Sequence, residues 1–336
     1  MTVLIVALQV SISSLQRLLL DASPKHRYKS KPTMAEFIRP APSNGMAPSS
    51  WFILLFALSA ISVGVRAVPA PHTLTARQDA IIPLPPAEIA AFKPYTWYAS
   101  TANCNPSSTK AWNCGENCDA NYDGYVGYDP TLNVVVVGHQ GTDVSKIIPV
   151  LIDLDIPLVQ LDAELFPGVD PSVRVHQGFA GTQSRSAPGV LAAVEEALSL
   201  YPTKNVTVVG HSLGAAIALL DAVYLPLHLP SDVNVRYIGY ASPRVGDQAW
   251  ANYVDSLHMN ITRINNKEDP VPVLPPIEIF GYHHASGEVH IRDYDVWVSC
   301  PGQDNPSDQC STGAVNITTF DAAQHPGPYD GVTIQC

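Results

Sequence analysis

The stretch Val206-Thr207-Val208-Val209-Gly210-His211-Ser212-Leu213-Gly214 joins a β-branched apolar run to a Gly-x-Ser-x-Gly pentapeptide. A run of small and aliphatic residues, 215–220, follows at once. A strand, a tight turn and a helix in this order are typical of a nucleophile elbow, which presents a serine hydroxyl at the positive end of the helix. The pentapeptide alone is a weak signal, but this context predicts that Ser212 is a nucleophile. The alternative is an idle serine in a glycine-bearing turn.

Apolar β-rich runs alternate with helical patterns along the rest of the chain. The predicted strands are 132–137, 206–209, 235–240 and 261–264, with possible edge strands at 289–298 and 314–319, and the predicted helices are 189–200, 213–225 and 247–257. This alternation predicts an α/β fold with a mostly parallel central sheet and helices on both faces. Together with the elbow, it favours an α/β-hydrolase. In such sheets the chemistry gathers at the carboxyl ends of the strands.

The first part of the 336-residue chain is predicted to lie outside the folded domain. Residues 46–67 contain an apolar block that ends in Val-Arg-Ala, which is typical of a signal peptide and too short for a membrane span of about 20 residues. Residues 1–45 are interpreted as a gene-model extension or a disordered segment; the alternative is a membrane-anchored or intracellular form with a basic arm. Residues 68–94 are a propeptide or an N-terminal wrap, and 95–336 form a single domain. The mature protein is therefore expected to be secreted.

The predicted mature chain is strongly acidic. Residues 71–336 hold 12 Lys and Arg against 28 Asp and Glu, a formal net charge of −16. Such a surface argues against nucleic acid or anionic lipid as a partner. The charge does not indicate an oligomeric state.

All six cysteines lie in the predicted mature chain, and in a secreted protein an even number favours disulfides over metal binding. Cys114 and Cys118, and Cys300 and Cys310, are close enough for local loops, but six cysteines allow 15 pairings. Three Asn-x-Thr sequons permit N-glycosylation, at Asn205, Asn260 and Asn316. The first two adjoin predicted strands, which makes their occupancy doubtful.

A serine nucleophile needs a base to take its proton and an acid to orient that base, in the chain order Ser, Asp or Glu, His. Asp269 follows strand 261–264 and is favoured over Glu268, because Pro270 stiffens the loop after it. A simple Asp-Pro turn is the alternative. His325 is the predicted base, since it lies in a terminal loop after the last strand. A buried structural role is the alternative for His325 and the favoured role of the other three, which are His283, His284 and His290.

The tetrahedral oxyanion needs preset hydrogen-bond donors. One is the backbone N–H of Leu213, directly after the nucleophile. The second is expected from Thr142, in the loop 138–143, where Gly141 lets the chain turn closely. His139 is interpreted as a packed scaffold residue. This chemistry requires no metal and no organic cofactor.

Taken together, these residues resemble the fungal class 3 lipases, a group that also contains type A feruloyl esterases. The resemblance covers roughly 95–336 and depends on the segments 210–214, 240–246, 269–272, 275–276 and 281–284, on Glu288 and on the cysteines. It implies a triad at Ser212, Asp269 and His325, an oxyanion residue at Thr142 and a disulfide between Cys104 and Cys336. The chain departs from the family at Gln140, where Arg is frequent, and at Pro326, where an aromatic residue is frequent.

The segment after Thr142 is predicted to be a lid. Its apolar residues recur at helical spacing and could meet a lipid surface: Val144, Ile147, Ile148 and Leu151. Pro149 is expected to break or end a helix there. The alternative is that this stripe packs into the core.

An apolar lid favours acylglycerols over plant phenolic esters, because the related feruloyl esterases tend to carry a polar flap. The expected function is therefore a secreted serine ester hydrolase that cleaves acylglycerols at an oil–water interface. Two alternatives stay open, a feruloyl or aryl esterase with the same triad and a catalytically inactive secreted binding protein.

Overall fold

The computed structural model describes residues 5–6, 80–104, 124–142, 144–153, 157–316 and 318–335. All of them belong to one compact unit of the chain. The predicted signal peptide lies outside the described residues, as do Asp143, Cys114, Cys118 and Cys336. The predicted division of the chain into a leader, a propeptide or wrap and one domain stays a prediction.

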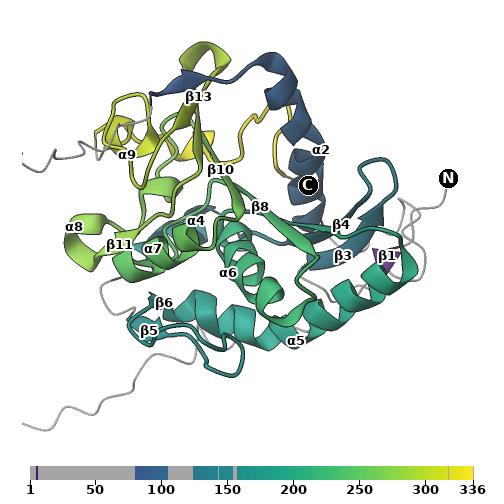
Figure 1. Ribbon diagram of the computed structural model, residues 1–336. Coiled ribbons are helices and arrows are strands. Elements are labelled where there is room, and N and C mark those ends of the chain that lie inside the picture. Colours follow the sequence, from purple (N-terminus) through teal and green to yellow (C-terminus); the bar gives the residue numbers. More distant parts are fainter. Residues whose placement is uncertain are drawn as a thin grey trace, which may run out of the picture. The chain divides into compact units, whose positions relative to one another are not determined.

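The described strands form a nine-stranded sheet in the order β1-β3-β4-β7-β8-β10-β12-β13-β2 (Figure 1). The strands are β1 (Ile5–Val6), β2 (Ile82–Pro83), β3 (Gly124–Asp129), β4 (Val134–His139), β7 (Asn205–His211), β8 (Asn234–Tyr240), β10 (Asn260–Asn266), β12 (Glu288–Arg292) and β13 (Val296–Cys300). The five central strands, β4, β7, β8, β10 and β12, run parallel to one another. The strands outside them are antiparallel to their neighbours. This is the predicted α/β architecture with a mostly parallel centre.

A second, antiparallel sheet of four short strands has the order β11-β9-β6-β5. These strands are β5 (Leu158–Gln160), β6 (Arg174–His176), β9 (Gly246–Asp247) and β11 (Tyr282–His283). No pattern in the sequence predicted them, since each has only two or three residues.

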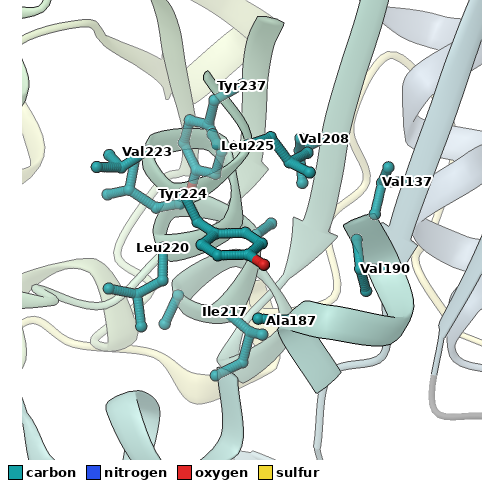
Figure 2. Close-up of a cluster of buried hydrophobic side chains, with 14 of the residues drawn as sticks. Val137, Ala187, Val190, Val208, Ile217, Leu220, Val223, Tyr224, Leu225 and Tyr237 are labelled. Atoms are coloured by element: carbon teal, nitrogen blue, oxygen red, sulfur yellow. The ribbon is translucent and has the colours of Figure 1, made fainter. Parts of the chain in front are cut away.

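The residues of the central strands divide between two cores, one on each face of the sheet. Val135, Val137 and Val208 face a core that includes the helices α5 (Gln177–Leu200) and α6 (Leu213–His228). Figure 2 shows side chains of this core, among them Leu220, Val223 and Tyr224 of α6 and Val208 of β7. On the opposite face, Val134 and Val136 join a core with helix α2 (Pro86–Ala102). The alternation of side chains along a strand therefore explains both layers.

Helix α2 begins inside the stretch that was predicted to be a propeptide or an N-terminal wrap. Pro85 directly precedes the helix, and Pro86 is its first residue. The N–H groups of the first turn have no acceptor within a helix, so the missing N–H of proline costs no hydrogen bond there. Phe92, Tyr95 and Ala99 of this helix are buried against the sheet. The strand β2 from the same stretch pairs with β13 at the edge of the large sheet.

The remaining described α-helices are α4 (Val144–Leu151), α7 (Gln248–Ser256), α8 (Ile277–Phe280) and α9 (Ser311–Ala314).

Two predictions about helices and strands were wrong. Helix α5 starts at Gln177 and passes through Pro188, whereas this helix was predicted to start only at 189, after that proline. Burial of Phe179, Gln183 and Ala187 along one face holds the helix together on the N-terminal side of Pro188. The predicted strand at 314–319 is absent from the described residues, which form the end of α9 and a turn.

The structure contains a disulfide between Cys300 and Cys310, one of the two local loops that were expected. Cys104 is also disulfide-bonded, and its predicted partner Cys336 lies outside the described residues.

Within the described part of the chain, every helix is too short or too polar to cross a membrane.

We expect Leu220→Ala in α6 to lower the free energy of unfolding by about 2–5 kcal/mol, because it leaves a cavity in a fully buried part of the core. Leu200→Ala, at the exposed end of α5, is the matched control and is expected to change it by less than about 0.5 kcal/mol. Urea unfolding followed by circular dichroism measures both values. Equal losses in the two variants would contradict the assignment of this core.

Candidate active site

Ser212 lies between β7 and α6 in a strained backbone conformation. Its φ and ψ angles are 58° and −128°, outside the regions that a residue with a side chain usually adopts. Such strain costs on the order of 1–3 kcal/mol and persists only where the surroundings impose it. The backbone N–H of Ser212 donates to the carbonyl of Tyr240 on β8 at 2.9 Å, which anchors the turn to the neighbouring strand. The geometry is that of the predicted nucleophile elbow.

The elbow is packed so closely that glycine is needed at two of its positions. A Cβ on Gly210 would lie 2.3 Å from the carbonyl oxygen of Gly214. A Cβ on Gly214 would in turn lie 2.4 Å from the carbonyl oxygen of His139, at the end of β4. The loop after β4 makes the same kind of approach, since a Cβ on Gly141 would lie 2.6 Å from the carbonyl oxygen of His211. Because these segments touch backbone to backbone, the predicted oxyanion loop lies directly against the elbow.

One of the two oxyanion donors predicted from the sequence comes from the elbow, and the other comes from the loop after β4. Leu213 is the first residue of α6, so its N–H has no acceptor within the helix. Thr142 directly follows Gly141 and is partly buried. The neighbouring Asp143 lies outside the described residues.

Asp269 and His325 meet although they are 56 residues apart in the chain. His325 Nδ1 lies 2.9 Å from Asp269 Oδ2, and both side chains are almost fully buried. The other carboxylate oxygen of Asp269 accepts the backbone N–H of Val271 at 3.0 Å, which fixes the orientation of the acid. The N–H of Asp321 donates to the carbonyl of Glu268 and holds the two loops together.

Two of the buried polar atoms that lack a hydrogen-bond partner among the described residues belong to the predicted triad. They are the Oγ of Ser212 and the Nε2 of His325. Leaving a buried donor or acceptor unpaired costs about 1–3 kcal/mol, so such atoms need an explanation. They are the two atoms between which a serine-histidine pair transfers a proton.

The backbone of His325 is held by two further side chains. Its carbonyl oxygen lies 2.9 Å from His211 Nε2 and 3.0 Å from the Tyr329 hydroxyl, which donates to it. Burial, and then the neighbouring His325, lower the pKa of His211 to about 3, so its imidazole is neutral and can donate from Nε2. Burial, and then the charge of Asp269, raise the pKa of Tyr329 well above its usual value, so its hydroxyl remains protonated. No local sequence signal indicated the contact made by Tyr329.

The other three histidines beyond Asp269 have structural contacts. His284 Nε2 lies 2.7 Å from the carbonyl of Pro272, and His290 is bonded through both ring nitrogens to backbone carbonyls. His283 Nδ1 lies 3.3 Å from Asp304. These contacts agree with the structural roles favoured from the sequence.

A buried ion pair that the sequence analysis did not find supports the loop after Asp269. Arg244 Nε donates to Asp304 Oδ1 at 2.8 Å, and its Nη1 donates to the carbonyls of Val273 and Pro275. Burial raises the pKa of Asp304, but the contacts with His284 and Arg244 outweigh it and lower the pKa to about 2. Arg244 belongs to the segment 240–246 that carried part of the resemblance, but its partner lies 60 residues later in the chain.

Helix α4 contains the four residues of the predicted lid. Ile147 and Leu151 are buried in the core that also contains α5 and α6, and Ile148 packs against it. The side chain of Val144 lies outside the described part of the structure. Pro149 lies inside α4 and does not break it, and the helix ends two residues later, at Leu151. With eight residues, α4 is short, as the sequence analysis expected.

The described residues contain no group of three or more His, Cys, Asp or Glu side chains that could hold a metal ion. The candidate site consists of a serine on an elbow, a buried Asp–His pair and a loop packed against the elbow. On this fold, these features define a serine hydrolase.

Comparisons with known proteins agree with this class. Residues 128–279 match the family model for lipase (class 3). A secreted mono- and diacylglycerol lipase of Gibberella zeae is 31% identical over 263 residues, which cover 74% of this chain and 80% of the relative. A secreted mono- and diacylglycerol lipase of Malassezia globosa is 31% identical over 198 residues, which span 58% of this chain and 61% of that relative. The chain belongs to the class 3 lipase family.

A solved structure agrees with the same assignment. The triacylglyceride lipase of Rhizomucor miehei superimposes with a TM-score of 0.63 at 26% identity, over 76% of this chain and 98% of that structure. The α/β-hydrolase architecture predicted from the sequence is therefore confirmed.

We expect Asp304→Asn to lower the free energy of unfolding at pH 6, and the gap between wild type and variant to narrow by about 1 kcal/mol between pH 6 and pH 3. The sign follows from the lowered pKa of Asp304: its stabilisation is complete above about pH 4 and is lost as the pH falls toward 2. Urea unfolding at several pH values measures the gap. Asp293→Asn in an exposed turn is the control, and a gap that does not change with pH would contradict the assignment.

Proposed function

We propose that Ser212, Asp269 and His325 form the catalytic triad of this lipase. The observation that supports the proposal most directly is the 2.9 Å contact between Asp269 and His325 on the same fold as the Ser212 elbow. His325 Nδ1 is engaged by the acid, which leaves Nε2 as the atom that can accept the serine proton. The hydrogen bonds to the carbonyl of His325 restrict how far its ring can move.

In the proposed mechanism, His325 Nε2 takes the proton of Ser212 as its Oγ attacks the ester carbonyl. The N–H of Leu213 and the N–H and hydroxyl of Thr142 stabilise the oxyanion, and each donor contributes about 3–4 kcal/mol to lowering the barrier. The C–O bond to the alcohol then breaks, and protonated His325 gives its proton to the leaving oxygen. A water molecule then loses its proton to His325 and attacks the acyl-enzyme. The bond between the acyl carbon and Ser212 Oγ breaks, His325 returns the proton to Ser212 Oγ, and the fatty acid leaves.

We propose mono- and diacylglycerols as the substrates, with triacylglycerols as a second candidate. Both relatives named above carry that activity in their names. Ser212 is fully buried, so a substrate needs the site to open, and the apolar helix α4 is the proposed lid. Feruloyl or aryl ester hydrolysis by the same triad is the alternative that the experiment below tests.

The protein is proposed to be secreted, with residues 46–67 as its signal peptide. The two relatives are named as secreted proteins. The three sequon asparagines, Asn205, Asn260 and Asn316, are exposed, although the first two begin β7 and β10. N-terminal sequencing of protein recovered from culture medium tests the cleavage site, and any residue before Met46 would contradict the proposed start.

We expect Ser212→Ala to reduce the rate of fatty acid release by at least about a thousandfold, because the nucleophile is lost. Initial rates are measured on monooleoylglycerol and dioleoylglycerol emulsions, on trioctanoin and on methyl ferulate, with Ser199→Ala on the surface of α5 as the control. Faster release from the acylglycerols is expected. Faster release of ferulate would overturn the substrate class, and full activity of Ser212→Ala would overturn the triad.

A further inference from the structure

Two side-chain contacts, one partly buried and one buried, hold the loop 139–142, and the proposed catalytic mechanism uses neither of them. The first is made by Asn103, at the C-terminal end of α2. Its Oδ1 accepts the backbone N–H of Gly141 at 2.9 Å, and its Nδ2 donates to the carbonyl of Ala99 at 2.8 Å. Asn103 therefore links the last turn of α2 to the residue directly before Thr142.

The second contact joins the start of the loop to the nucleophile helix. His139, the last residue of β4, places Nε2 2.8 Å from Asp221 Oδ2 on α6. The other carboxylate oxygen of Asp221 accepts from Gln183 Nε2 on α5 at 2.9 Å. Asp221 is fully buried between apolar neighbours, where a carboxylate costs several kcal/mol unless it is paired. Asp221 therefore contacts α5 through one carboxylate oxygen and the end of β4 through the other.

Glycine in the loop explains why such supports are needed. Gly141 must lack a side chain, because a Cβ would lie 2.6 Å from the carbonyl oxygen of His211. The same lack of a side chain makes glycine the most flexible residue of a loop. Its peptide unit precedes Thr142, whose N–H and hydroxyl are proposed to bind the oxyanion. Misplacement of such a group by about 1 Å can cost about a hundredfold in rate.

We propose that Asn103, from the α2 side, and the His139–Asp221 pair, from the α6 side, are positioning residues for the oxyanion loop. The inference rests on the proposed function of Thr142. It assigns to α2 a part in transition-state stabilisation, although α2 contributes none of the triad or oxyanion groups. Asn103 restrains the Gly141 peptide, and Asp221 restrains the strand end from which the loop leaves the sheet.

The chain offers a closely matched control for Asn103. The hydroxyl of Thr101 also donates to the carbonyl four residues before it, that of Trp97, at 2.9 Å in the same last turn of α2. Asn103→Ala removes both the bond to the helix and the bond to Gly141, whereas Thr101→Val removes a bond to the helix. Comparison of the two variants separates the loop contact from the loss of helix stability.

The test measures kcat and KM of the full secreted protein on soluble p-nitrophenyl butyrate, with the active enzyme counted by a fluorophosphonate probe and Tm recorded for each variant. We expect Asn103→Ala to lower kcat by about tenfold or more with KM changed by less than about twofold, because an oxyanion contact acts in the transition state. Thr101→Val is expected to keep the wild-type kcat. An unchanged kcat for Asn103→Ala would overturn the role of Asn103.

The double variant His139→Phe/Asp221→Leu tests the second support without leaving an unpaired buried charge. Replacing both members of a buried pair with apolar residues is often neutral for stability. The substitution also leaves the buried Gln183 Nε2 without its acceptor, so this protein is expected to fold with a Tm somewhat below that of wild type. Its kcat is expected to fall by about tenfold. Wild-type kcat in the folded double variant would overturn the role of the pair.

A double-mutant cycle that combines Asn103→Ala with Thr142→Val shows whether Asn103 acts through the oxyanion loop. We expect Asn103→Ala to lower kcat by a smaller factor in the Thr142→Val background than in wild type, because part of the interaction that it supports is already gone. Equal factors in the two backgrounds would contradict an action through Thr142. Ser212→Ala is assayed in parallel: if it keeps full activity, the proposed triad fails, whereas its inactivity beside a fully active Asn103→Ala refutes the positioning role alone.

Discussion

The contact of three backbone segments at the carboxyl ends of β4 and β7 is the constraint on which the site depends. Gly210, Gly214 and Gly141 each approach a carbonyl oxygen more closely than a Cβ would allow. This contact sets Ser212 into its strained conformation and brings the loop after β4 against the start of α6. The strain costs on the order of 1–3 kcal/mol, and packing of α5, α6 and the sheet into a common core supports it.

The polar groups around this contact show how a buried site can be both rigid and reactive. His325 is held through its side chain by Asp269 and through its carbonyl by His211 and Tyr329. The loop after Asp269 is held in the same way by Arg244, which is itself paired with Asp304. Hydrogen bonds fix the surroundings, while Ser212 Oγ and His325 Nε2 have no partner among the described residues. Preorganised surroundings with free reacting atoms are what acyl transfer requires.

Prediction from the sequence succeeded for features that depend on neighbouring residues and failed where distant contacts decide. Valine-rich runs predicted β4 and β7 within two residues at their ends. Pro149 was expected to break or end a helix, and the helix that ends at 200 was predicted to start only at 189. Pro149 and Pro188 instead each lie inside a helix with buried apolar residues on both sides of the proline. The short strands β5, β6, β9 and β11 had no detectable pattern, because two or three residues cannot show a period of two.

The sequence by itself indicated the alternation of the main strands and helices, the elbow at Ser212 and the candidate residues Asp269 and His325, because these follow from local composition and from the order of the motifs along the chain. Tertiary structure alone decided which polar groups meet. Asn103 reaches Gly141 across 38 residues, His139 reaches Asp221 across 82, and Tyr329 reaches the carbonyl of His325 through a turn that no local pattern predicts. The physical reason is that a polar contact of about 3 Å depends on where packed helices and strands place two atoms, and the residue types alone do not encode that distance.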